Sequence, residues 1–269
     1  METPEALGII AGSGAYPLQV ATSARRAGVK KIAAVAFSNE TEPALAEHVD
    51  AIEWLRVGQL GRLLSFFKAA GTRHAIMAGQ IAPKNLFDVR PDVKTLLLLA
   101  RLKRRNAATI FGAIADELAA IGVELLPATT FLDEALAQPG LIAGRALNRR
   151  EEADVRYGFD VAKEVSRLDI GQTVVVKDGT VVAVEAFEGT NEAIKRGGAL
   201  ARKGAVLVKV AKPNQDMRFD VPVIGAQTVE IASGASIRVI AVEAGKTLLL
   251  EKHQLVAAAT RHGLSIVGV

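Results

Sequence analysis

The side chains best suited to chemistry gather in one short stretch of this sequence, residues 209–220. Two carboxylates four residues apart, Asp216 and Asp220, can share a divalent cation. The cations Lys212 and Arg218 beside them can hold an anionic substrate such as phosphate. A loop that only connects two elements needs turn formers, although a solvated loop with internal ion pairs has the same composition. The polar residues of the stretch are Lys209, Lys212, Asn214, Gln215, Asp216, Arg218 and Asp220.

The elements on either side of this stretch predict a mixed α/β domain. Residues 205–210 indicate a buried strand that leads into the loop. Upstream, Asp178 and Gly179 separate two valine-rich runs, which is a strong signal for a β-hairpin. Downstream, Gly245 and Lys246 predict a second hairpin. Further helices and strands are expected at 190–203, 228–233, 237–242, 254–261 and 265–269.

A second candidate site lies near the N-terminus, where a strand over 6–11 is followed by Gly12, Ser13 and Gly14 and then by an apolar-periodic helix. A strand, a glycine turn and a helix offer backbone N–H groups to a phosphate. The turn lacks the third glycine of the dinucleotide fingerprint, so a tight turn without a ligand is an equal alternative.

A neighbouring strand over 74–78 is followed by Gln80 and Lys84. Because ligands of open parallel sheets lie at the carboxyl ends of strands, we expect Gln80 and Lys84 to face the same cleft as the glycine turn.

These patterns predict an α/β fold with two α/β domains. The N-terminal domain, 1–132, is expected to be a Rossmann-like parallel sheet. Residues 133–168 are interpreted as a linker and a connecting helix, and 169–269 as a C-terminal catalytic domain with a mixed sheet and helices.

Composition narrows the function classes. The chain has no cysteine, which excludes disulfides and thiolate metal sites and fits a reducing compartment. Aromatic residues make up only 4%, so the basic and aromatic pattern of single-strand binders is missing and no nucleic-acid partner is expected. There is no signal peptide or long apolar span, which predicts a cytoplasmic location.

Four consecutive leucines, 96–99, precede a basic cluster at 101–105. Apolar residues beside cations suit an interfacial membrane contact or an acyl-chain pocket. A buried helix with a solvated basic end is the alternative, and the pattern alone favours it.

Carboxylates, cations and a glycine turn together fit metal-assisted hydrolysis of a phosphoanhydride. The four histidines show neither metal nor triad spacing. The residues alone do not identify the substrate.

Several longer motifs carry a family resemblance. They are GIIAGSGAYP, AGQIAPKNL, VVVKDG, AVEAFEGTN, VLVKVAKPNQDMRFDVPVIG and EAGKTLLLE. Together they resemble the LpxI-type UDP-2,3-diacylglucosamine diphosphatase family over essentially the whole chain.

The resemblance implies hydrolysis of UDP-2,3-diacylglucosamine to 2,3-diacylglucosamine 1-phosphate (lipid X) and UMP in lipid A biosynthesis, with Mg²⁺ or another divalent cation. It places the essential aspartate at Asp220, with Asp216 second. On the hypothesis of metal-dependent hydrolysis, we expect the metal on Asp220, Asp216 and Glu188, with Lys209 as a further catalytic residue that neutralises phosphate charge. The substrate-binding residues expected from the motifs are Gly12, Ser13, Gly14, Gln80, Lys84, Gly189, Thr190, Asn191, Lys212, Gln215 and Arg218.

One departure concerns Asn191, which stands where the family commonly has aspartate. An amide binds metal more weakly and cannot act as a base, so no metal role is assigned to it. The expected partners are the UDP-linked diacylated glucosamine and, transiently, the inner-membrane surface of a Gram-negative bacterium; a homo-oligomer is compatible with the sequence. The alternative function is a nucleotide-binding module without hydrolytic chemistry.

Overall fold

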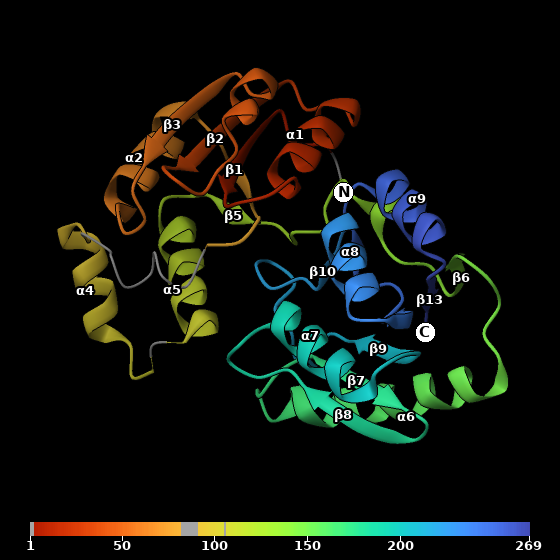
Figure 1. Cartoon of the computed structure of the whole chain (residues 1–269). Helices are drawn as coiled ribbons and strands as arrows, with labels where there is room; N and C mark the ends of the chain where they lie inside the picture. The colour runs from red at the N-terminus through yellow and green to blue at the C-terminus, as the bar shows by residue number, and fades with distance from the viewer. Residues whose placement is uncertain (1–2, 82–90, 105) are drawn as a thin grey trace. The chain divides into compact units, whose positions relative to one another are not determined.

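The computed structural model describes residues 3–81, 91–104 and 106–269, and it divides into two compact units (Figure 1). The first unit comprises Met1–Asp133 and Asp216–Asp220, and the second comprises Glu134–Gln215 and Val221–Val269. The segment Asp216–Asp220 therefore packs with the first unit although the chain on either side of it belongs to the second. No helix in the described ranges is long and apolar enough to cross a membrane.

A five-stranded parallel sheet in the order β3-β2-β1-β4-β5 forms the centre of the first unit, which confirms the predicted Rossmann-like sheet. The central strands are apolar almost throughout because helices cover both faces of such a sheet. The strands are β1 (Ala6–Ala11), β2 (Lys31–Phe37), β3 (Ala51–Leu55), β4 (His74–Ala78) and β5 (Glu124–Leu125).

Helices of the first unit bury one apolar stripe each against this sheet or against one another. Phe67 of α2 is fully buried, and Gly8 of β1 makes room for its ring, because a Cβ at Gly8 would lie 3.0 Å from it. The helices are α1 (Tyr16–Arg26), η1 (Pro43–His48), α2 (Leu60–Ala70), α4 (Val93–Arg101) and α5 (Ala107–Ala120).

The second unit is built on a six-stranded mixed sheet in the order β6-β13-β11-β9-β7-β8, as the mixed-sheet prediction requires. The predicted hairpin is confirmed: β7 pairs antiparallel with β8, and Asp178 and Gly179 turn the chain with positive φ. The strands are β6 (Gly140–Ala143), β7 (Thr173–Lys177), β8 (Thr180–Val184), β9 (Ala205–Lys209), β11 (Ile237–Val242) and β13 (Ser265–Gly268).

The prediction of a hairpin at Gly245 is wrong. The chain turns there, but the strand that follows, β12 (Leu248–Leu249), pairs in parallel with β10 (Val223–Ile224) and not with β11. A turn signal fixes where the chain bends, whereas the pairing partner of a two-residue strand is set by tertiary packing.

Residues 133–168 are interpreted from the sequence as a linker and a connecting helix; from Glu134 onward they pack within the second unit. Strand β6 pairs antiparallel with β13, and helix α6 packs against β9 and β7. Gly158 makes this close approach possible, because a Cβ there would lie 2.6 Å from Val208 Cγ2. The helices of this unit are η2 (Asp133–Ala135), α6 (Arg149–Arg167), α7 (Thr190–Ala201), α8 (Ala226–Gly234) and α9 (Lys252–His262), where η2 starts one residue before the unit boundary.

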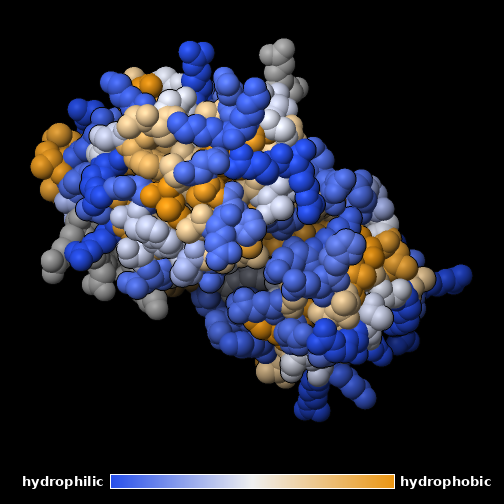
Figure 2. Space-filling view, turned by 90° about the horizontal axis from the view of Figure 1, so that it is seen from above, coloured by the Kyte–Doolittle hydropathy of each residue, from blue (hydrophilic) through white to orange (hydrophobic). Residues whose placement is uncertain are grey.

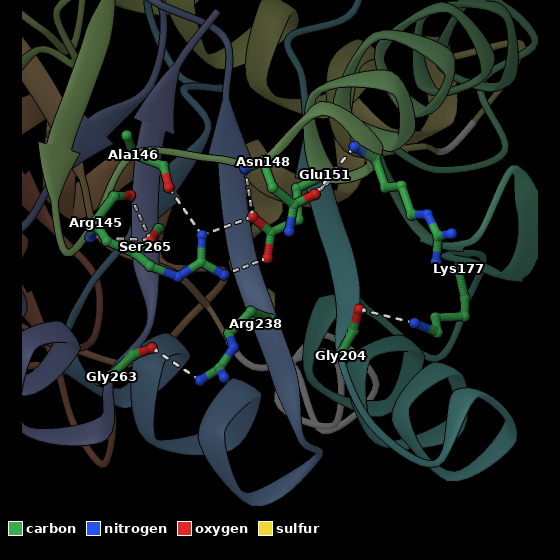
Figure 3. Close-up of polar contacts among 10 residues, drawn as sticks. Arg145, Ala146, Asn148, Glu151, Lys177, Gly204, Arg238, Gly263 and Ser265 are labelled. Carbon is green, nitrogen blue, oxygen red and sulfur yellow. Dashed lines mark hydrogen bonds and ion pairs between the residues drawn. The ribbon is translucent and has the colours of Figure 1, made fainter.

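Cations at one edge of this sheet, next to the amino ends of β9, β11 and β13, have structural partners (Figure 3). Arg145 and Glu151 point toward one another and form a bidentate ion pair with distances of 2.8 and 2.6 Å. Lys177 and Arg238 donate to the backbone carbonyls of Gly204 and Gly263. The polar groups of this unit that are candidates for chemistry lie at the opposite edge, where β8, β9 and β11 end.

Candidate functional site

The glycine turn after β1 is held against the end of β4. Gly12 N–H donates to the Ala78 carbonyl at 2.7 Å, and Ser13 donates to the Gln80 carbonyl through its N–H at 2.7 Å and its hydroxyl at 2.9 Å. A Cβ on Gly12 would lie 2.5 Å from the Gln80 carbonyl oxygen, so only glycine allows this approach. The structure thus brings Gly12, Ser13 and Gln80 together as the strand order predicts. Lys84 lies outside the described residues.

The start of α1 next to this turn has no side chain that caps its first backbone N–H groups. Gly14 has φ +83°, and a Cβ there would find open space among the described residues. The N-cap residue is Ala15, whose methyl group cannot accept a hydrogen bond from the first turn of the helix. Tyr16 anchors the helix start through a 2.6 Å hydrogen bond from its hydroxyl to the Ala128 carbonyl, and burial raises its pKa.

A chain of buried polar groups lies at the carboxyl end of β9 in the second unit. Lys209 Nζ donates to the Thr190 hydroxyl at 3.3 Å and to the Val223 carbonyl at 3.1 Å. The Thr190 hydroxyl in turn donates to Glu185 Oε1 at 2.8 Å. Lys209 and Glu185 are only 7% and 8% exposed, so their charges interact through a medium that screens poorly.

Glu185 is, with Glu188, Asp216 and Asp220, one of the acidic residues that the sequence predicts near strand ends, but our assignment of site residues left it out. It follows β8, and it also accepts a hydrogen bond from Gln172 N–H at 3.3 Å. The motif AVEAFEGTN showed two glutamates, and the resemblance directed us to the second, Glu188. The alternation of β8 gives no signal that Glu185 is buried, because the residue lies just beyond the strand.

The residues at the start of α7 differ in their surroundings. Gly189 is the N-cap with φ +82°, Thr190 belongs to the buried chain, and Asn191 is exposed. Glu188 is exposed and pairs with Arg196 at 2.5 Å, and hydrogen bonding from Arg196 holds its pKa below the usual range. Of this group, Thr190 is joined to Lys209 through its hydroxyl.

The backbone that carries Lys212 is positioned by Glu243 at the end of β11. Glu243 accepts from Ala211 N–H at 2.8 Å, and it pairs with Lys163 and Lys246 at 3.0 Å each. Burial works against the charge of Glu243, but these hydrogen bonds outweigh it and lower the pKa. Lys212 itself pairs with Asp169.

Gln215 closes this loop and uses only part of its side-chain amide for hydrogen bonds within the described residues. Its Oε1 accepts from Lys212 N–H at 2.5 Å. Its Nε2 is buried without a hydrogen-bond partner in the described part of the chain, as is Oε1 of Gln172. Buried amides that lack partners have a cost, and polar groups of a substrate can remove it.

The Asp216–Asp220 segment is held by the first unit. Met217 accepts a 2.7 Å hydrogen bond from Ala128 N–H, and the Phe219 ring lies 5.7 Å from the Phe111 ring, centroid to centroid. Arg218 donates to both carboxylate oxygens of Asp216 at 2.7–3.2 Å and so holds the pKa of Asp216 below its usual range. Asp220 is half-buried, and its N–H donates to the Asp216 carbonyl at 3.0 Å.

A metal site made by protein ligands alone is not assembled among these residues. The described residues contain no cluster of three or more acidic or histidine side chains that could hold a metal ion. Asp216 has both oxygens occupied by Arg218, and Glu188 is paired with Arg196. Carboxylate oxygens such as those of Asp220 are the kind of donor that Mg²⁺ takes when water and substrate phosphates supply its other ligands.

Fold and site together define a class: an α/β protein of two units, with a glycine turn on a Rossmann-like sheet and a row of hydrogen-bonded polar side chains on a mixed sheet. Family models match both halves of the sequence, the LpxI N-terminal domain over residues 6–135 and the LpxI C-terminal domain over residues 138–267. The chain belongs to the LpxI family.

A curated relative supports this assignment. The chain is 31% identical over 274 aligned residues to the UDP-2,3-diacylglucosamine pyrophosphatase LpxI of Caulobacter vibrioides, and the match covers 98% of this chain and 97% of the relative. A solved structure of the biotin carboxylase domain dimer of Hydrogenobacter thermophilus 2-oxoglutarate carboxylase covers 67% of this chain and 36% of its own, at 13% identity. Its TM-score of 0.28 is too low to carry any argument.

Proposed function

We propose that this protein hydrolyses the diphosphate bond of UDP-2,3-diacylglucosamine in lipid A biosynthesis, releasing UMP and 2,3-diacylglucosamine 1-phosphate. The observation that carries the proposal is the full-length match to a relative named for this pyrophosphatase activity, together with both family domains. In the reaction, a water oxygen bonds to one phosphorus atom, and the bond from that phosphorus to the bridging oxygen breaks. Of the two water protons, one passes to a base and the other to the leaving phosphate.

Two groups of residues have complementary tasks in this proposal. The turn at 12–14, with Ser13 fixed to Gln80, supplies backbone amides for the anionic nucleotide part of the substrate. Lys209, held by Thr190 and the Val223 carbonyl, neutralises charge on the phosphoryl oxygens, and Lys212 assists. Glu185 keeps Thr190 and, through it, the Lys209 ammonium in position.

Asp220 is assigned the essential carboxylate, with Asp216 second because Arg218 occupies its oxygens. When bound, Mg²⁺ would neutralise phosphate charge and polarise the attacking water. Asp220 would be its protein ligand, and Glu188 would assist after release from Arg196. Two arguments support the proposed Mg²⁺: the family resemblance, and the preference of this cation for carboxylate oxygens.

The test is release of UMP from UDP-2,3-diacylglucosamine by the purified full chain, with Mg²⁺ and after EDTA. We expect metal-dependent release, and a loss of about a hundredfold or more in kcat for Asp220→Asn. Asp160→Asn changes an exposed aspartate on α6 and serves as the matched control. A folded Asp220→Asn protein with full metal-dependent turnover would refute the assignment. Binding of UDP without any UMP release would instead support the nucleotide-binding alternative.

A further inference from the structure

Helix α4 of the first unit presents an apolar stripe to solvent. Val93, Leu96 and Leu97 are 72%, 52% and 55% exposed, and Ala100 on the same side is exposed as well. These positions follow the i, i+3, i+4, i+7 spacing of one helix face. Figure 2 shows one face of the molecule, on which hydrophobic patches lie among hydrophilic residues.

The opposite face of α4 accounts for the rest of its apolar residues. Leu98 is buried in the core, and Leu99 and Leu102 pack partly against it. The helix therefore has two apolar faces, of which the first unit covers one. The alternative prediction of an ordinary buried helix explains Leu98 but leaves Leu96 and Leu97 without a role.

Hydrogen bonds fix which face points outward. Asp92 caps α4 by accepting from Thr95 N–H at 2.8 Å, and its second oxygen accepts from Gly61 N–H at the start of α2 at 2.7 Å. The Thr95 hydroxyl donates to the Gly58 carbonyl at 2.6 Å. Because one end of the helix is attached to α2 in this way, turning the leucines inward would break all of these bonds.

The charged side chains that follow the exposed stripe toward the C-terminal end of α4 are all basic. Arg101, Lys103 and Arg104 follow the stripe directly and are all exposed. Lys94 also lies on the helix and pairs with Glu117 of α5, and residues 93–104 contain no acidic side chain. A solvent-exposed apolar stripe next to several cations is complementary to a surface that is both apolar and anionic.

We propose that the exposed face of α4 docks on an anionic phospholipid bilayer, with Leu96 and Leu97 entering the boundary between headgroups and acyl chains. Arg101, Lys103 and Arg104 would contact the lipid phosphates. Neither step needs a helix that spans the membrane. The inference goes beyond the hydrolysis proposed above, and because vesicle binding is measured without substrate, its failure would leave that proposal untouched.

Sedimentation of the full chain with vesicles tests the proposal. Two kinds of vesicle are compared. The first contains phosphatidylglycerol and phosphatidylethanolamine and is anionic, and the second is pure phosphatidylcholine. We expect binding to the anionic vesicles that weakens at high salt. The double change Leu96→Gln and Leu97→Gln should weaken it roughly tenfold, because two half-exposed leucines lose the apolar area they would insert. Neutralising Arg101, Lys103 and Arg104 to Gln should weaken it about a hundredfold.

The matched control carries Leu141→Gln and Leu200→Gln, two exposed leucines of the second unit with similar exposure. It should bind vesicles like the unchanged protein. Vesicle binding that the α4 variants leave unchanged would overturn the proposal, as would no binding at all. A dimer in solution that the leucine variant dissociates, without vesicle binding, would instead assign this face to a second copy of the chain. Unchanged thermal melting shows that each variant is folded.

Discussion

The turn before α1 and the turn before α7 both lead into a helix whose N-cap has no polar side chain, Ala15 in one case and Gly189 in the other. Around the first turn, the close contacts come from backbone: Gly12 and Ser13 bond to the carbonyls of Ala78 and Gln80. Behind the second turn lie ionic side chains, where Lys209 and Glu185 meet at the Thr190 hydroxyl.

In the proposed function, this difference assigns substrate binding to the first turn and chemistry to the second. Backbone amides at a helix start attract any phosphate and need no particular side chain, so the first turn suits a group that is held but not changed. Buried ions cost free energy unless they are paired, and they are kept where charge changes during a reaction. We therefore expect changes at the second turn to lower the rate and changes at the first to lower affinity or stability.

The largest effect should follow Lys209→Met. The change removes the ammonium that the polar chain is built around and leaves Glu185 buried without it, so kcat for UMP release should fall about a hundredfold or more. Lys195→Met is the control, because it changes an exposed lysine of α7 that pairs with Glu192. In this variant, kcat should fall less than twofold. Equal losses in the two variants would mean that the buried chain has no special role in the rate.

The next largest effect should follow Gly12→Ala, and it tests the backbone side of the comparison. The new methyl group would lie 2.5 Å from the Gln80 carbonyl oxygen and 2.8 Å from its nitrogen, so the turn must shift. We expect a loss of about 2 kcal/mol in unfolding free energy and weaker UDP binding, both measured by denaturant titration and calorimetry. Gly14→Ala, where a Cβ meets open space but φ is +83°, should cost only about 1 kcal/mol. If Gly14→Ala proves the more damaging, backbone strain dominates over packing.

Glu243→Gln should have a moderate, pH-dependent effect on stability. The change weakens hydrogen bonds to Lys163, Lys246 and Ala211, and about 1–2 kcal/mol should be lost at pH 7. The folded pKa of Glu243 lies below its unfolded value, so its contribution is fully present above that unfolded value, about 4.5, and disappears as the pH falls through the folded pKa. The difference between the two proteins should therefore shrink between pH 6 and pH 3. A difference that stays constant down to pH 3 would contradict the ion-pair explanation.

Sequence patterns were sufficient to predict those parts of the structure that depend on residues close together in the chain. Strands β1, β4 and β11 match their predicted residues because their apolar runs are bounded by turn residues. The meeting of Gly12 with Gln80 followed from the rule that parallel strands end at one edge. The hairpin at Gly245 failed because a local turn does not determine long-range pairing.

The parts of the candidate site that the sequence did not reveal depend on contacts between distant residues. Nothing local indicates that Phe219 packs against Phe111 and takes the Asp216–Asp220 segment into the first unit. Nor does the motif AVEAFEGTN indicate that Glu185, and not Glu188, reaches Thr190. That choice depends on where β8 ends relative to the start of α7.

Asn191→Asp should have the smallest effect, and it sharpens the comparison at the second turn. Asn191 is exposed in the first turn of α7, where a carboxylate interacts favourably with the helix dipole, so unfolding free energy should rise by about 0.5 kcal/mol. Because Asn191 lies outside the buried chain of Lys209 and Thr190, Mg²⁺-dependent release of UMP should change less than threefold. A rate increase of tenfold or more would contradict this view. It would show that an exposed carboxylate beside the buried chain takes part in metal binding, and that the chemistry at this helix start extends into solvent-facing positions.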